Sequence, residues 1–407
     1  PDEMVRAMLL LRARTLAQGH SGVRPEVVAK LLEMLDRDIL PVVPSQGSVG
    51  ASGDLAPFAH LALPVIGEGT VKVDGRIVAT SESGLEPLQL RTKEGLSLLN
   101  GTEGMTAMGV LALDSCRKLV LAADTACALS VEALMGSARP FDPRVHELRP
   151  HPGQAASAER IAGLIAGSEI GASHADDFHH AVQDAYSLRC APQVHGAVSD
   201  TLDHVEAVLR RELSAVVDNP IVFPETGDVI SAGNFHGEPL AFALDFAAIA
   251  VSELASISER RTDRILDPVR SAGLPAFLAP DPGVNSGYMI AQYTQAALVA
   301  ENRVLAHPAS VDSVPTSGMQ EDHVSMGWGA GRKLFSIIDN VRRVIAIEIL
   351  CAVQGIEYRK PLKPAPGTGA IVEKIRSIVP SLTADRSLSD EIETVARSIE
   401  TGELDIR

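Results

Sequence analysis

Three long stretches rich in alanine and leucine constrain the fold of this 407-residue chain more than any other feature. They cover residues 104–135, 238–264 and 286–305, and are nearly free of internal proline. Because proline disrupts helix interiors, its absence favours long helices. Their apolar residues cover much of each helix circumference, which is typical of helices enclosed by other helices. We therefore predict a mainly α fold with a central bundle of long helices.

Shorter patterns predict the remaining elements. Helical periodicity places apolar side chains on one face near the N-terminus and on another near the C-terminus: Val27, Val28, Leu31, Leu32 and Leu35, and Leu334, Ile337, Ile338, Val341 and Ile345. Residues 71–78 predict a hairpin, because Asp74-Gly75 suits a type I′ turn. A second pairing is expected between residues 221–223 and 229–231. The strands are thus one or two small hairpins on a helical body.

Composition excludes several classes of protein. A net charge of −16 argues against non-specific binding to nucleic acid or to anionic membranes. The longest apolar run, residues 105–134, contains Asp114, Arg117, Lys118 and Asp124, which makes it a buried helix rather than a membrane span. The four cysteines are scattered without metal or disulfide spacing. We expect a cytoplasmic protein.

Domain organisation follows from the absence of internal boundaries in the sequence. We find no repeat, charge block or low-complexity linker, so residues 1–407 are predicted to form a single continuous helical body. The chain begins with Pro1 rather than Met, and Pro1-Asp2-Glu3 is typical of a helix start. We expect the natural N-terminus to lie upstream.

The segment Gly47-Ser-Val-Gly-Ala-Ser-Gly-Asp-Leu-Ala-Pro57 contains residues that can form an electrophile, which unmodified side chains lack. If the amide nitrogen of Gly53 attacks the carbonyl of Ala51, a five-membered ring closes. Loss of two waters then leaves Ser52 as a dehydroalanine. Gly53 lacks a Cβ and so permits the close approach of backbone to backbone, while Asp54 is suited to moving the protons. A bare Ala-Ser-Gly triplet in a loop is common, so the surrounding residues must decide.

The eleven residues resemble the self-processing loop of the histidine ammonia-lyase family, whose ring is called methylideneimidazolone. Four further blocks resemble motifs of the same family in the same order, and together they span nearly the whole chain: Leu98-Leu-Asn-Gly-Thr102, Gln183-Asp-Ala-Tyr-Ser-Leu-Arg-Cys190, Gly233-Asn-Phe-His-Gly237 and Gln320-Glu-Asp-His-Val-Ser-Met326.

The resemblance implies an aspartase/fumarase-like ammonia-lyase architecture and a homotetramer whose active sites combine motifs from more than one subunit. It implies a methylideneimidazolone made by the chain from Ala51, Ser52 and Gly53, with no external cofactor. The reaction would be elimination of ammonia from an aromatic α-amino acid. The N-terminal part of the family fold, with a tyrosine base and a ring-recognising residue, would precede Pro1.

The motifs imply roles for individual side chains. Arg189 would bind the substrate carboxylate in a bidentate manner, although an isolated arginine is more often a surface ion-pair partner. Tyr186 would steer protons or hydrogen-bond near the ring. Asn100 and Gln183 would hold the ring oxygen or the substrate; without the motifs, both would pass for ordinary polar residues. Phe235 would line an apolar wall beside the substrate ring, or simply pack in the core.

Glu321 bears on the substrate. A carboxylate can accept a hydrogen bond from an imidazole N–H, whereas a phenyl ring offers no donor. Capping of a helix is its ordinary alternative role. Glu321 therefore favours L-histidine as substrate and urocanate as product. The alternatives are a tyrosine or phenylalanine ammonia-lyase or an aminomutase of the same family, and, from another class, a non-catalytic helical assembly protein.

A metal site is the remaining hypothesis, raised by the seven histidines His60, His174, His179, His180, His195, His236 and His323. The run from His174 to His180 mixes imidazoles with carboxylates. Neighbouring His179 and His180 would point to different faces of a helix, however, and a self-made electrophile removes the need for a Lewis acid. We predict no metal.

Overall fold

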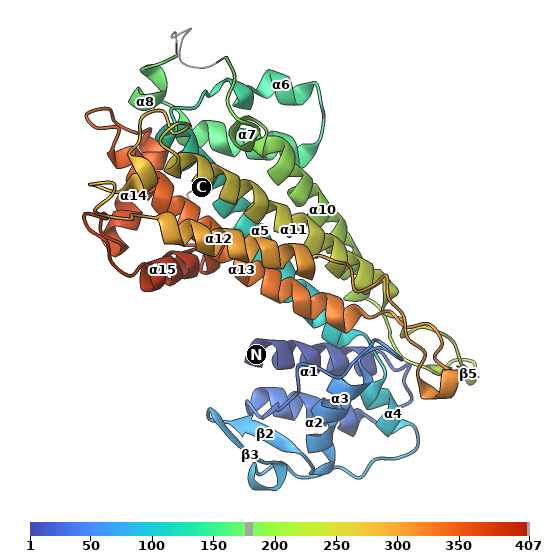
Figure 1. Ribbon diagram of the computed structural model, residues 1–407. Coiled ribbons are helices and arrows are strands. Elements are labelled where there is room, and N and C mark those ends of the chain that lie inside the picture. The colour runs from blue at the N-terminus through green and yellow to red at the C-terminus, as the bar shows by residue number, and fades with distance from the viewer. Residues whose placement is uncertain (176–181, 405–407) are drawn as a thin grey trace. The chain divides into compact units, whose positions relative to one another are not determined.

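The computed structural model describes residues 1–175 and 182–404, and within them it is a mainly α protein with two small sheets (Figure 1). The predicted fold class is confirmed. Contacts divide the chain into two compact units. Unit 1 comprises residues 1–113, 204–246 and 308–334, and unit 2 comprises residues 114–203, 247–307 and 335–407. Four of the five unit boundaries fall within α5, α10, α11 and α13, and the fifth lies between residues 307 and 308, after α12. The single continuous body stays a prediction.

Unit 1 carries the five strands found among the described residues. Its helices are α1 (Asp2–Ala17), α2 (Pro25–Asp36), α3 (Leu55–Ala62), α4 (Glu94–Leu99) and the adjoining parts of α5 (Glu103–Ala133), α10 (Ala191–Glu212), α11 (Glu238–Leu266) and α13 (Gly327–Glu357). The strands are β1 (Leu40–Pro41), β2 (Thr70–Val73), β3 (Arg76–Ala79), β4 (Ile221–Phe223) and β5 (Asp228–Ile230).

Both predicted hairpins form. β2 pairs antiparallel with β3 in the register Val73 to Arg76, and β1 adds to the other edge of β2. Asp74 and Gly75 both have positive φ, as a type I′ turn requires. β4 pairs antiparallel with β5, which begins one residue earlier than predicted.

The face predicted for residues 27–35 is only partly right. In α2 the buried side chains are Val27, Leu31 and Met34, spaced four and three residues apart, whereas Leu32 is 41% exposed. A helix buries a single stripe of this spacing, and Leu32 lies beside that stripe rather than on it. The second predicted face, residues 334–345 on α13, is buried at all five positions.

Unit 2 contains the other parts of α5, α10, α11 and α13, together with α12 (Met289–Leu305). The predicted long helices are therefore confirmed. Its shorter helices are α6 (Pro143–Glu147), α7 (Pro152–Ile165), α8 (Glu169–Ala172), α9 (Tyr186–Arg189), α14 (Pro366–Ile378) and α15 (Ser389–Glu400). Long helices of this unit lie side by side in Figure 1.

A buried polar cluster ties the long helices of unit 2 together. Arg261 on α11 donates two hydrogen bonds, of 2.5 and 2.8 Å, to Glu348 on α13, which also accepts one of 2.6 Å from Ser130 on α5. Gln295 on α12 donates to the carbonyl of Val344 at 2.7 Å. Because the Arg261 and Glu348 side chains have no solvent exposure, removing either partner would leave a buried charge.

Membrane-spanning potential is confined, among the described residues, to α11. This helix is long and apolar enough by length and composition, and 56% of its apolar window is buried inside the protein. Burial of this kind is typical of a core helix.

Candidate active site

The loop before α3 has an unusual backbone. Gly50, Ser52 and Gly53 all have positive φ, at 80°, 50° and 79°. Such values suit glycine, but Ser52 carries a side chain and is disfavoured there. The Gly53 amide donates to the Gly50 carbonyl at 3.2 Å, which closes a tight turn around Ala51 and Ser52. The predicted self-processing residues therefore lie in a strained turn.

Gly53 is pressed against the backbone that follows α4. It forms a parallel bridge with Gly101, and the next amide, that of Asp54, donates to the Gly101 carbonyl at 2.7 Å. A Cβ added to Gly53 would come closer than 3.0 Å to that carbonyl oxygen. The approach is possible only because residue 53 has no side chain.

Asp54 is a buried acid beside this turn. Its carboxylate accepts a hydrogen bond of 2.9 Å from the amide of Met105, in the first turn of α5. Burial raises the pKa of Asp54 well above its usual value, and the neighbouring Glu103 carboxylate adds to the effect. A carboxyl group of this kind retains a proton more readily than an exposed one. The role of Asp54 in moving protons stays a prediction.

The side chain of Glu321 is in direct hydrogen-bond contact with that of Ser52. The Ser52 hydroxyl donates to Oε1 of Glu321 at 2.9 Å, across 269 residues of sequence. The other oxygen, Oε2, accepts from Ser317 at 2.6 Å and from Thr316 at 2.8 Å. These bonds, from Ser317, Thr316 and then Ser52, lower the pKa of Glu321. The group next to Ser52 is therefore an ionised carboxylate.

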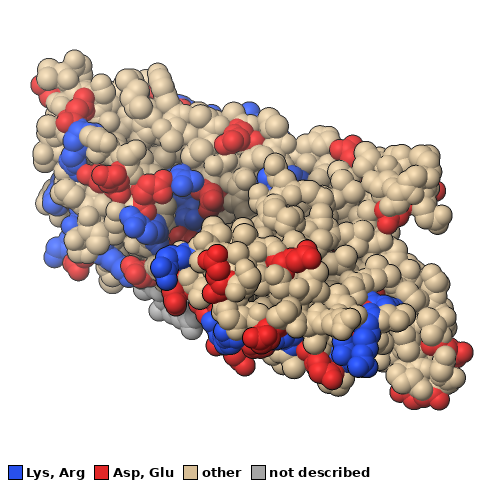
Figure 2. Space-filling model, turned by 90° about the horizontal axis from the view of Figure 1, so that it is seen from below, with Lys and Arg blue, Asp and Glu red and all other residues tan. Residues whose placement is uncertain are grey.

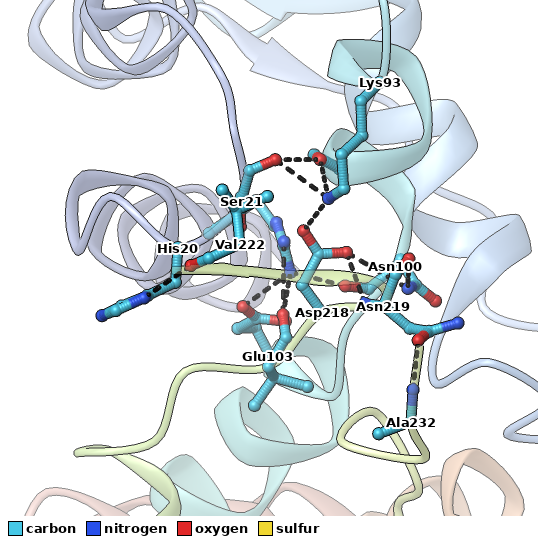
Figure 3. Close-up of polar contacts among 12 residues, drawn as sticks. His20, Ser21, Lys93, Asn100, Glu103, Asp218, Asn219, Val222 and Ala232 are labelled. Atoms are coloured by element: carbon cyan, nitrogen blue, oxygen red, sulfur yellow. Dashed lines mark hydrogen bonds and ion pairs between the residues drawn. The ribbon is translucent and has the colours of Figure 1, made fainter. Parts of the chain in front are cut away.

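Asn100 directly follows α4 and is 2% exposed. Its side-chain nitrogen donates to Oδ1 of Asp218 at 3.2 Å and to the Asn219 carbonyl at 3.0 Å. Its Oδ1 is buried without a partner among the described residues. The Asn100 carbonyl accepts from Arg12, which is also paired with Glu103 at 2.8 Å. Figure 3 shows these contacts around Asp218 and Asn219.

Three of the predicted residues lie in unit 2. The guanidinium carbon of Arg189 is 4.5 Å from the centroid of the Tyr186 ring, which is 71% exposed. The Arg189 Nε is buried without a partner among the described residues. Gln183 is exposed and lines a cavity of about 870 Å³. Tyr186 and Arg189 are thus brought together in one unit, as Ser52 and Glu321 are in the other.

Phe235 lies in the turn before α11 and is half-buried. The next residue, His236, belongs with Glu238 and His323 to the one group of three possible metal ligands found in the described part of the chain. Nδ1 of His236 and Nε2 of His323 each lie 3.9 Å from Oε2 of Glu238. Tetrahedral zinc with bonds of about 2.1 Å holds its ligands roughly 3.4 Å apart, so the group is wider than a preformed site.

The other histidines have varied surroundings. His195 is buried and paired with Asp124 at 2.7 Å, His60 is exposed, and His174 is half-buried. His179 and His180 fall outside the described residues. The absence of a metal stays a prediction.

The sequence pattern of the family described as "Aromatic amino acid lyase" matches residues 1–377. The chain belongs to this family. Proteins named histidine ammonia-lyase from Gloeobacter violaceus and Deinococcus radiodurans are 53% and 55% identical to this lyase; each alignment covers 99% of it, and 79% and 77% of the relative. The family resemblance predicted from the motifs is confirmed.

Solved structures agree with this lyase in fold. Histidine ammonia-lyase from Trypanosoma cruzi has a TM-score of 0.91 at 43% identity, covering 99% of the lyase chain and 77% of its own. Tyrosine aminomutase from Streptomyces globisporus also has a TM-score of 0.91, at 41% identity, covering 98% and 80%. Because one fold serves both enzymes, the side chains must decide the substrate.

The structure adds residues to the site of this lyase that the sequence analysis did not single out. Gly101 supports the turn at Gly53, Thr316 and Ser317 hold Glu321, and Asp218 holds Asn100. Gly101 belonged to a quoted motif, but the other three are ordinary polar residues outside the α-helices. Only their contacts reveal them.

Proposed function

We propose that this lyase eliminates ammonia from L-histidine to give urocanate. The names of its relatives support histidine as substrate. The observation that carries the proposal within the chain is the position of Glu321, an ionised carboxylate in contact with Ser52. An imidazole N–H placed there gains a charged acceptor, whereas a phenyl ring offers no donor to Oε1, since Ser317 and Thr316 bond only to Oε2.

The proposed electrophile forms from Ala51, Ser52 and Gly53. The Gly53 nitrogen adds to the Ala51 carbonyl carbon, and the carbonyl oxygen leaves as water with the amide hydrogens of Gly53 and Ser52, so that a C=N bond forms between the Ala51 carbon and the Ser52 nitrogen. The second water takes the Ser52 hydroxyl and the hydrogen on its Cα. The positive φ values of Ser52 and Gly53 and the bare Gly53 backbone support this group, because they compact the turn in which the ring must close. Once formed, the group supplies an electrophilic methylene toward the substrate.

Dehydration of Ser52 also prepares the Glu321 carboxylate. When the Ser52 hydroxyl is lost, Oε1 of Glu321 loses its hydrogen-bond donor, while Ser317 and Thr316 still hold Oε2. A carboxylate held through Oε2, with Oε1 free of a donor, is suited to accept a hydrogen bond from the imidazole N–H of the substrate. Ring formation and histidine recognition are thereby coupled.

The remaining site residues keep the roles that the motifs imply. Arg189 binds the substrate carboxylate. Its buried Nε has no partner among residues 1–175 and 182–404, and this supports the role, since an unsatisfied buried donor is costly. Tyr186, whose ring lies against the Arg189 guanidinium, steers protons or hydrogen-bonds near the methylideneimidazolone ring. Gln183 binds the substrate or the ring oxygen, and Phe235 packs against the imidazole.

We further propose a homotetramer in which each active site draws residues from more than one subunit. An apolar stripe on α12 supports association. Its exposed members recur at alternating steps of three and four residues: Ile290, Tyr293, Ala297, Ala300 and Val304. Such a stripe is the seam by which helices pair.

The protein is proposed to be cytoplasmic, with no nucleic-acid or membrane partner. The net charge of −16 supports this, since phosphate backbones and anionic lipids repel an acidic protein. On the face drawn in Figure 2, basic and acidic side chains of the described residues are intermixed.

The test is urocanate formation by the full-length protein. L-Histidine is added and near-UV absorbance is followed, because the product conjugates its double bond with the imidazole. A Ser52→Ala variant, which cannot dehydrate, is the control. Rising absorbance only in the unaltered protein supports histidine elimination. A dehydrated ring by intact mass without absorbance would contradict the substrate and favour tyrosine, phenylalanine or an aminomutase reaction. Absence of the ring would contradict the electrophile.

A further inference from the structure

The side-chain amide of Asn100 is held in one orientation. Both of its hydrogens are donated, one to Oδ1 of Asp218 and one to the Asn219 carbonyl (Figure 3). A backbone carbonyl can only accept, and so can an ionised carboxylate. Turning the amide over would place its oxygen against two acceptors. The free atom of Asn100 is therefore Oδ1 and not the nitrogen.

This argument requires Asp218 to be ionised, and its surroundings ensure it. Burial raises the pKa of Asp218, but hydrogen bonds to its carboxylate, led by that from Lys93, lower the pKa by more. Lys93 donates to Oδ2 at 2.7 Å, and the Asn219 amide donates to Oδ1 at 2.7 Å. The Lys93 ammonium is itself fixed by the Ser21 carbonyl and the Ser97 hydroxyl, both at 2.9 Å.

Asn100 is also adjacent to the self-processing turn. It directly precedes Gly101, whose backbone bridges Gly53 and accepts from the Asp54 amide. Its Oδ1 is buried and has no hydrogen-bond donor among the residues that the structure describes. An acceptor left in this state is costly, and a ligand N–H would satisfy it.

We propose that Asp218, supported by Lys93, is a positioning residue that presents Oδ1 of Asn100 to the amino group of the substrate. The inference rests on the proposed function. Of the two roles that the motifs left open for Asn100, it favours the substrate over the ring oxygen, because neither Oδ1 of Asn100 nor the carbonyl oxygen of the ring carries a hydrogen to donate. An acceptor at the amine orients the nitrogen that departs as ammonia.

The experiment replaces Asp218 by Asn in the full-length protein. Asp218→Asn retains the shape but removes the charge that fixes both Lys93 and Asn100. We expect kcat/KM for L-histidine to fall roughly tenfold to a hundredfold, the effect of one hydrogen bond to a charged group. Intact mass should still show the loss of two waters. Imidazolepropionate, which is histidine without its amino group, should inhibit with unchanged affinity. Asp228→Asn, an exposed acid on β5, is the matched control.

A double-mutant cycle separates positioning from general damage. If Asp218 acts through Asn100, Asn100→Ala and the double variant should have the same kcat/KM. The proposal would be overturned if the factors by which the two single substitutions lower kcat/KM multiply in the double variant. It would also be overturned if Asp218→Asn weakened imidazolepropionate binding as much as it lowered kcat/KM for histidine. If Asp218→Asn does not fold, Lys93→Met replaces it in the same test. We expect Lys93→Met to lower kcat/KM by a smaller factor, and to have no effect on kcat/KM when Asn100 is already alanine. If Lys93→Met still lowers kcat/KM in the Asn100→Ala variant, the proposal is overturned.

Failure of the proposed function can be distinguished from failure of the inference about Asp218. It would show as an unaltered protein that forms the ring but does not consume histidine. The cycle is then measured with the aromatic amino acid that is consumed and with its des-amino analogue. Asp218 keeps its assigned role only if the two substitutions remain non-additive.

Discussion

Replacing Gly53 by alanine should prevent formation of the electrophile while leaving most of the fold intact. Two costs arise at this position. Its φ of 79° lies in the left-handed region, where a side chain costs about 1–2 kcal/mol. The added Cβ would also lie within 3.0 Å of the Gly101 carbonyl oxygen, whereas ordinary contact begins at 3.4 Å. Relief requires the two backbones to separate by more than about 1 Å.

Gly75 provides a control that separates the two costs. Its φ is 76°, nearly that of Gly53, but a Cβ added there meets nothing within 4 Å. Gly75→Ala therefore carries the backbone cost alone and should lower Tm by a few °C. Gly53→Ala adds the steric separation from Gly101, which pulls the Gly53 nitrogen away from the arrangement needed for ring closure.

Intact mass and thermal unfolding together check the prediction. Gly75→Ala should lose two waters like the unaltered protein, and Gly53→Ala should keep its unprocessed mass while unfolding cooperatively. The reasoning is refuted if Gly53→Ala processes normally. It is equally refuted if Gly75→Ala also fails to process, since positive φ alone would then explain the loss.

Three further predictions concern stability, substrate binding and assembly. The Arg24 guanidinium lowers the pKa of Glu94 to about 2, so this pair stabilises the fold above the unfolded pKa near 4.5 and less as pH falls toward 2. Glu94→Gln should cost about 1–3 kcal/mol in urea unfolding at neutral pH and flatten the acid dependence; an unchanged acid dependence would contradict this. Arg189→Lys should raise KM for histidine about tenfold with little change in Tm, because lysine lacks the bidentate fork; an unchanged KM would remove Arg189 from the carboxylate site. Tyr293→Glu should dissociate the assembly in light scattering and abolish activity, and an intact, active oligomer would show that α12 is not an interface.

The sequence determined the elements and the chemistry that depend on neighbouring residues. The long helices follow from uninterrupted apolar stretches, and the β2–β3 turn follows from Asp74-Gly75. The eleven consecutive residues 47–57 are enough to predict that the Ala51-Ser52-Gly53 triplet is a self-processing segment. Periodicity and turn chemistry act over a few residues, so they can be recognised in the sequence without knowledge of the fold.

Only the tertiary structure decided which distant groups meet. Glu321 was assigned to the substrate from its residue type, but its contact with Ser52 joins positions 269 residues apart. The orientation of Asn100 depends on Asp218, which no local pattern distinguishes. Leu32 passes for a core residue by hydrophobicity and is exposed, because a neighbouring element covers only one stripe of α2. A hydrogen bond forms where packing brings donor and acceptor within about 3 Å, and packing is a property of the whole fold.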